Sequence, residues 1–116
     1  MNIIQIDEDF ENVERISVCV GSLQVYALQL LDSDESHVDI SAGTLSVTYI
    51  NVATGASYAF SGGSAVLTKW YAEQGVLSLL NPSAYPTPGQ VRITITWTNG
   101  SIVRRFGPLI VSVYSL

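Results

Sequence analysis

The stretch RITITWTNGSIVRRF, residues 92–106, decides the fold. Its first half alternates polar residues, mostly threonines, with Ile93, Ile95 and Trp97, and a two-residue period is typical of a β-strand with one buried face. The chain then reverses at Asn99-Gly100, a strong hairpin signal because both central positions of a type I′ turn need positive φ. We therefore predict a hairpin with Trp97 facing the core. Its threonine row would face solvent or a neighbouring subunit.

The same alternation recurs along the chain, whereas helical periodicity is almost absent. The segment RISVCV places Ile16, Val18 and Val20 on one face, and turn-forming residues separate it from further short strands. The exception is KWYAEQG, residues 69–75, where a helical turn ending at Gly75 is plausible. These patterns predict an all-β, immunoglobulin-like antiparallel β-sandwich of about 7–9 strands. Because the chain has one cysteine, no internal disulfide is expected.

The length predicts one domain over residues 1–116. Residues 1–14 are either an N-terminal arm that reaches a neighbouring subunit or simply the first strand and turn. As an arm, the segment would use apolar anchors: Ile3, Ile4, Ile6 and Phe10. The first residues lack the pattern of a signal peptide, and no apolar stretch approaches the ~20 residues that span a membrane. We expect a protein made in a cytoplasm, without a membrane partner.

Charge is scarce, because Asp, Glu, Lys and Arg make up 13% of the residues. Serine and threonine supply the polar surface instead. Small hydroxyls are easier to desolvate than Lys or Glu, which suits a protein packed into an assembly, but threonine is also common in any β-protein. The net charge of −5 argues against nucleic acid as a partner, since such binding needs a basic face.

The charges are also unevenly distributed. Five of the ten acidic residues lie within the first 14 positions, and three of the five basic residues are Arg92, Arg104 and Arg105. Regions of opposite sign could dock head to tail between copies, which makes Arg104 and Arg105 interface candidates. The other interpretation is that the acidic run is a solvated terminus.

Residues with catalytic or metal-binding potential are few. His37, the only histidine, lies in a polar turn, and Cys19 in ISVCV is expected to be a buried or half-buried strand thiol. Neither suggests an enzyme or a cofactor. Asp32, Asp34 and Asp39 supply oxygen ligands of the kind that Ca²⁺ prefers, but the EF-hand pattern fails. They are weak metal candidates, and a solvated acidic turn is the alternative.

Three aromatic residues, Trp70, Tyr71 and Tyr85, are expected in loops. Exposed aromatic rings in loops can stack on sugar rings or anchor a protein interface. A small carbohydrate-binding or adhesin module is therefore one functional hypothesis. Alternatively, these rings cap the open end of the sandwich core.

Two stretches carry a resemblance to a known family. In LQLLDSDESHVDISAGTLSVTYIN, a strand ends in Asp32, and Val38-Asp39-Ile40-Ser41-Ala42-Gly43 opens the next strand. In TPGQVRITITWTNGSIVRRFGPLIVSV, a Pro-Gly precedes a strand and an Asn-Gly hairpin follows. The segment 28–116 thereby resembles an immunoglobulin-like module of tailed-bacteriophage virion proteins, similar to the N-terminal domain of upper baseplate proteins. It departs from that pattern at Glu35, Ser36 and His37, where relatives usually carry Gly and Pro.

The resemblance implies a non-enzymatic structural protein of the virion, present in many copies and made in the host cytoplasm. Its expected partners are other virion proteins, namely capsid, tail or baseplate subunits, and further copies of itself in a symmetric assembly. The capsid surface, neck, tail and baseplate all use such modules, so the position in the particle stays open. The resemblance transfers no catalytic residues.

Overall fold

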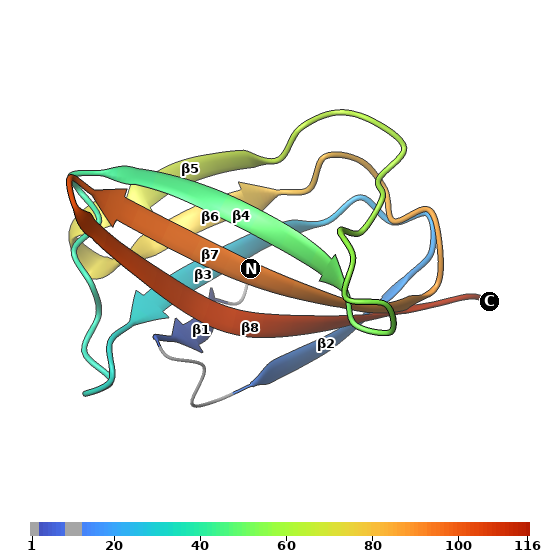
Figure 1. Cartoon of the computed structure of the whole chain (residues 1–116), viewed down its shortest axis with the longest axis horizontal. Helices are drawn as coiled ribbons and strands as arrows, with labels where there is room; N and C mark the ends of the chain where they lie inside the picture. Colours follow the sequence, from blue (N-terminus) through green and yellow to red (C-terminus); the bar gives the residue numbers. More distant parts are fainter. Residues whose placement is uncertain (1–2, 9–12) are drawn as a thin grey trace.

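The computed structural model describes residues 3–8 and 13–116, and these form a β-sandwich (Figure 1). Eight strands are found in this part of the chain, arranged in two sheets of four. A single turn of 3-10 helix, η1, joins two of the strands. In chain order the elements are β1 (Ile3–Asp7), β2 (Glu14–Cys19), β3 (Val25–Leu31), β4 (Thr44–Asn51), β5 (Val66–Tyr71), η1 (Ala72–Gln74), β6 (Val76–Leu80), β7 (Gly89–Asn99) and β8 (Ile102–Tyr114).

The two sheets are mixed, so the prediction of an antiparallel sandwich was wrong on this point. One sheet has the order β1-β3-β6-β5 and the other the order β2-β8-β7-β4, and both β1–β3 and β2–β8 are parallel pairs. β1 and β2 follow one another in the sequence but join different sheets, each as an edge strand. Two-residue alternation is the same in parallel and antiparallel strands, so the sequence pattern did not reveal the direction.

Within the segment 1–14, residues 3–7 form the strand β1. Ile3 to Asp7 pair with Ala27 to Leu31 of β3. Ile6 is buried, Ile4 packs against the core, and Ile3 is 49% exposed. Two of the three isoleucines proposed as anchors therefore stabilise their own domain. Phe10 lies outside the described residues.

The core lies between the sheets and is centred on the strands of the hairpin predicted from residues 92–106. Ile93, Ile95 and Trp97 face inward, and Trp97 is 7% exposed. The Trp97 indole Nε1 donates a hydrogen bond to the carbonyl of Ala42 over 2.8 Å. The predicted inward face of β2 is also confirmed, with Val18 in the core and Ile16 and Val20 packed against it.

The hairpin turn is displaced by one residue from its predicted position. Asn99 pairs with Ile102, so Gly100 and Ser101 are the two central residues. Gly100 has φ 61°, whereas the one non-glycine residue with positive φ in the described ranges is Glu35. Positive φ at the first central position alone is the type II′ pattern, which favours Gly-x. The type I′ assignment was therefore wrong, although the hairpin itself is present.

The helical turn predicted within residues 69–75 is confirmed. Ala72 to Gln74 form η1, and Gly75 ends it in the left-handed region with φ 72°. A Cβ atom on Gly75 would lie 2.6 Å from the carbonyl oxygen of Val38. Glycine is thus required here both for the backbone conformation and for the close approach of the loop that leads into β4.

Candidate interaction surface

The outer surface of the β2-β8-β7-β4 sheet is rich in hydroxyl groups and arginines, and we call it the hydroxyl face. Strand alternation builds it, because each residue between two core residues points outward. Across the β4–β7–β8 ladders, Thr48 pairs with Thr94, Ser46 with Thr96, and Thr96 with Arg105. The outward residues are Arg15, Ser17, Cys19, Thr44, Ser46, Thr48, Ile50, Gln90, Arg92, Thr94, Thr96, Thr98, Val103, Arg105, Ile110, Ser112 and Tyr114.

An open groove of about 450 Å³ crosses the hydroxyl face. β8 has a bulge at this place, since Leu109 pairs with Ile93 and Phe106 pairs with Ile95, so that two residues, Gly107 and Pro108, lie opposite Thr94. The groove thus combines hydroxyl groups, apolar side chains and two cations. It is lined by Val13, Thr48, Ile50, Arg92, Thr94, Thr96, Arg105 and Pro108.

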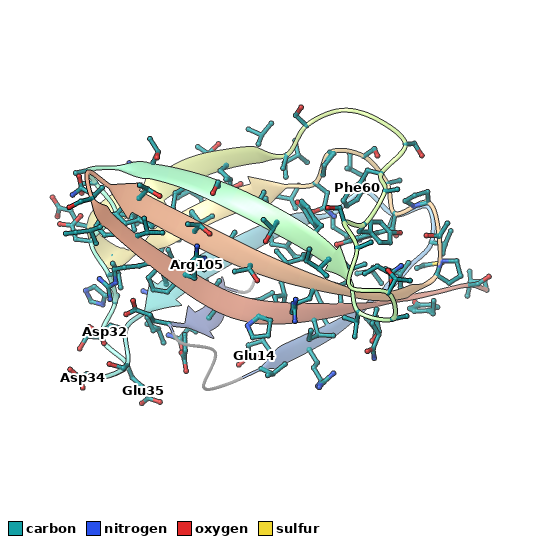
Figure 2. The ribbon with its side chains drawn as sticks, in the orientation of Figure 1. Glu14, Asp32, Asp34, Glu35, Phe60 and Arg105 are labelled. Atoms are coloured by element: carbon teal, nitrogen blue, oxygen red, sulfur yellow. The ribbon has the colours of Figure 1, made fainter. Side chains whose placement is uncertain are left out.

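The two arginines of the groove are exposed and unpaired. Neither Arg92 nor Arg105 makes a hydrogen bond or ion pair with any residue that the structure describes, and Arg15, at the β2 edge of the same face, is in the same state. Figure 2 shows Arg105 over the part of the sheet formed by β7 and β8. An unpaired guanidinium on a surface with little charge is well suited to bind a carboxylate or another anion.

Arg104, the neighbouring interface candidate, is engaged within the chain. Its Nε donates to the Glu8 carboxylate over 2.8 Å, and its Nη2 lies 2.5 Å from the second oxygen. The guanidinium carbon also lies 5.6 Å from the centre of the Phe106 ring. An acidic residue near the N-terminus and a late arginine thus meet in one copy rather than between copies. Arg105 alone of this pair remains available to a partner.

Of the metal candidates Asp32, Asp34 and Asp39, the first and the last use their carboxylates to bind groups of their own loop. Asp32 Oδ1 accepts hydrogen bonds from the backbone N–H groups of Asp34 (2.9 Å) and Ser36 (3.0 Å). Asp39 Oδ1 accepts from the Ser41 hydroxyl (2.6 Å) and backbone N–H (2.9 Å), and these bonds lower the pKa of the Asp39 carboxyl. Within residues 3–8 and 13–116, no three or more His, Cys, Asp or Glu residues gather as a metal site.

The three aromatic candidates differ in their surroundings. Trp70 and Tyr71 are 50% and 64% exposed, but they belong to β5 rather than to a loop, so that part of the prediction was wrong. A bulge between Lys69 and Tyr71 interrupts the alternation that would have identified the strand. Tyr85 does lie in a loop, but it is fully buried and caps the core. It is therefore removed from the set of surface candidates.

Tyr85 belongs to a buried tyrosine cluster that the sequence analysis missed. Its hydroxyl lies 2.8 Å from the Tyr26 hydroxyl, and the Tyr49 hydroxyl donates to Asn81 Oδ1 over 2.9 Å. Burial raises the pKa of Tyr26, Tyr49 and Tyr85 above the ordinary tyrosine value. These residues lie far apart in the sequence, in β3, in β4 and in the loops after β6, so no local pattern connects them.

The cluster is also incompletely hydrogen-bonded. The Asn81 Nδ2 and the Ser83 Oγ are buried, and neither has a hydrogen-bond partner in the described structure. The rings of Tyr58 and Phe60 pack edge-on at 5.0 Å between centroids, and Tyr58 also contacts Tyr85. Phe60 is labelled in Figure 2, at the end of the sandwich away from the loop of Asp32. The cluster closes this end of the core, which is a structural role.

The remaining candidates agree with their predicted positions. His37 is exposed, and Cys19 is half-buried on the outer face of β2.

In the described residues, no helix is long and apolar enough to cross a membrane. No protein-family model matches the chain, and no curated protein matches it either. Its function must therefore be inferred from its own residues and geometry.

Proposed function

We propose that this chain is a non-enzymatic structural component of a tailed-phage virion: a capsid decoration, head–tail, or tail or baseplate accessory protein. It would act through protein–protein contacts. The observation that carries the proposal is the hydroxyl face, a broad sheet surface on which Thr94, Thr96 and Thr98 are half-buried. Threonine loses little side-chain entropy on burial compared with Lys or Glu, so such a face can be covered by a partner at small cost.

The segment that resembles the phage modules has a consistent structural role. Val38 and Ile40 are buried, and Asp39 between them is exposed and binds Ser41. Gly43 has φ 83°, and a Cβ atom there would lie 2.5 Å from the carbonyl of Thr98. The signature therefore fixes the entry to β4 against the end of β7, as expected if this sandwich is of the immunoglobulin-like kind. The proposal is supported because the residues that carry the resemblance each have a defined role in this part of the fold.

The alternative function is a small carbohydrate-binding or adhesin module. Of the three rings on which this hypothesis depends, Trp70 and Tyr71 are exposed, whereas Tyr85 is buried in the core and could not contact a sugar. Two neighbouring rings on an edge strand offer a smaller stacking surface than three rings from separate loops. The hydroxyl face comprises residues from four strands, whereas Trp70 and Tyr71 come from one strand. We therefore place protein binding before carbohydrate binding.

The proposal is tested on particles. Virions from the host that makes this chain are banded on a density gradient, and the copy number per particle is measured by quantitative mass spectrometry. We expect a fixed, multi-copy stoichiometry relative to a major capsid or tail subunit. Absence of the chain from purified particles would refute the proposal.

Glycan binding is tested separately on an array with the purified protein. The carbohydrate alternative requires a signal that the Trp70→Ala variant loses. Tyr114→Ala, which removes a different exposed aromatic ring, is the matched control. A binding signal that depends on Trp70 but not on Tyr114 would favour the alternative over protein binding.

A further inference from the structure

We propose that the groove of the hydroxyl face binds the acidic loop 32–35 of a second copy of this chain. The starting observation is the separation of unpaired charges. Three of the five cations, Arg15, Arg92 and Arg105, project from the hydroxyl face, where no outward residue of the four strands is acidic. The other two, Arg104 and Lys69, are engaged within the chain.

The groove has the chemistry to receive carboxylates. Arg105 lies opposite Thr96, and Arg92 lies four residues earlier on β7, so the two guanidinium groups flank Thr94 along the groove. A guanidinium group can bind a carboxylate through two parallel hydrogen bonds, and the threonine hydroxyls can donate further bonds. Apolar groups from Val13, Ile50 and Pro108 complete the lining. They would pack against the carbon atoms of an inserted side chain.

The backbone of the acidic loop is held by hydrogen bonds within the loop. Asp34 and Glu35 are exposed, and neither carboxylate has a partner among the described residues. Asp32 holds the loop through the two hydrogen bonds that its side chain accepts. In addition, its backbone N–H donates to the Ser36 carbonyl (2.8 Å), and its carbonyl accepts from the Glu35 N–H (2.9 Å). These bonds define the backbone conformation of the loop, which reduces the backbone entropy that association would cost.

Within one copy, neither Asp34 nor Glu35 forms an ion pair with the arginines of the groove, so these carboxylates remain available to a second copy. In Figure 2, Asp34 and Glu35 lie at the lower left, away from Arg105 on the sheet. If the contact is reciprocal it closes a dimer, and if it is heterologous it propagates into a ring or an open chain. The inference deepens the proposed function by naming a second copy as one partner. Its test uses purified protein, so its outcome does not depend on the virion experiment.

The test measures self-association by sedimentation velocity over a range of protein and salt concentrations. We expect the wild-type protein to associate at low salt and to dissociate as salt rises, because the Debye length falls from about 10 Å at 0.1 M to about 3 Å at 1 M. Two double variants, Arg92→Gln/Arg105→Gln and Asp34→Asn/Glu35→Gln, should each weaken association about tenfold or more.

Mixing the two double variants tests whether the loop of one copy binds the groove of another. The first variant retains an intact loop and the second an intact groove, so the mixture should form 1:1 pairs that grow no further. Arg15→Gln and Glu73→Gln serve as charge-matched single controls, since Arg15 is outside the groove and Glu73 outside the loop. Both should associate more strongly than Arg105→Gln and Glu35→Gln, the single groove and loop variants that change the net charge by the same amount.

Two results would overturn the inference. One is a wild-type protein that stays monomeric at every concentration and salt. The other is association that survives either double variant, because the occupant of the groove would then not be the acidic loop. Thermal unfolding of each variant shows whether it is folded, and since all substitutions are at exposed positions, folding should be unchanged.

Discussion

Glu35 adopts a backbone conformation that a side chain disfavours, because its φ is 64°. The left-handed region brings Cβ close to the following carbonyl, at a cost of roughly 1–2 kcal/mol for most residues. Glycine avoids this cost but gains freedom in the unfolded chain, so part of the benefit is lost. We expect Glu35→Gly to raise the free energy of unfolding by about 0.5–1 kcal/mol, measured by urea denaturation.

Glu35→Gln is the matched control for that measurement. It removes the charge but keeps the Cβ atom, so stability should stay within about 0.5 kcal/mol of the wild type. If the glycine variant were no more stable than the glutamine variant, backbone strain at this position would be negligible.

Single residues also show where prediction from sequence reached its limit. Asp32 and Asp39 were identified as possible metal ligands because residue type alone does not say what a carboxylate binds. In the fold, each accepts bonds from residues two or four positions later. Such short-range bonds are typical of Asp in turns.

The β7–β8 hairpin and the entry to β4 depend on one another through Trp97. Its ring lies in the core, and its Nε1 binds Ala42, next to Gly43. We expect Trp97→Ala to lower the free energy of unfolding by roughly 3–5 kcal/mol, since it leaves a large cavity. Urea denaturation monitored by far-UV circular dichroism, which does not rely on the removed tryptophan, checks this value.

A milder substitution separates packing from hydrogen bonding at the same position. Trp97→Phe fills much of the cavity but leaves the Ala42 carbonyl without this donor, so we expect a loss of about 1–3 kcal/mol. An alanine variant no less stable than the phenylalanine variant would show that the ring contributes little to packing, contrary to its burial.

At the level of elements, alternation predicted most strands and the inward faces of β2 and β7. Strand direction was not predictable, because residues point alternately to the two faces whether the neighbour is parallel or antiparallel. The Asn-Gly pair identified the hairpin but not its register, since Gly-Ser forms an equally good turn one residue later. β5 was misjudged at Trp70 because a bulge breaks its alternation.

For the whole molecule, the buried tyrosine cluster makes stability sensitive to alkaline pH. Tyrosine in an unfolded chain has a pKa near 10, and burial raises the pKa of Tyr26, Tyr49 and Tyr85 above that. The unfolded state therefore releases protons first as the pH rises past about 10. Stability should be fully present below that pH and should then fall, by up to ~1.4 kcal/mol per pH unit for each tyrosine.

Chemical denaturation between neutral pH and pH 12 measures this slope, and Tyr26→Phe is the informative variant. It should be less stable at neutral pH, because the Tyr85 hydroxyl loses its neighbour at 2.8 Å, yet its stability should fall less steeply above pH 10. A stability that stays constant through pH 12 would contradict the burial of these hydroxyls.

The candidate surface was only partly predictable, because it is formed by residues from several strands that meet only in the folded molecule. The threonine row of β7 was recognised as an outward face, and Arg105 as an interface candidate. The groove, however, joins Thr48, Arg92 and Arg105, which come from three strands, and a bulge in β8 shapes it. No linear motif connects residues so distant in sequence.

The parallel pairing of β2 with β8 affects how the protein can be made. During synthesis, residues 14–19 leave the ribosome long before residues 109–114, with which they pair. The β2 edge of this sheet cannot be completed on the nascent chain until β8 has emerged. Contacts between residues so distant in sequence also slow folding, to milliseconds or seconds in other sandwiches of this kind. Until β8 is in place, the edges of β2 and β7 that it covers are unpaired, and unpaired strand edges are prone to aggregation.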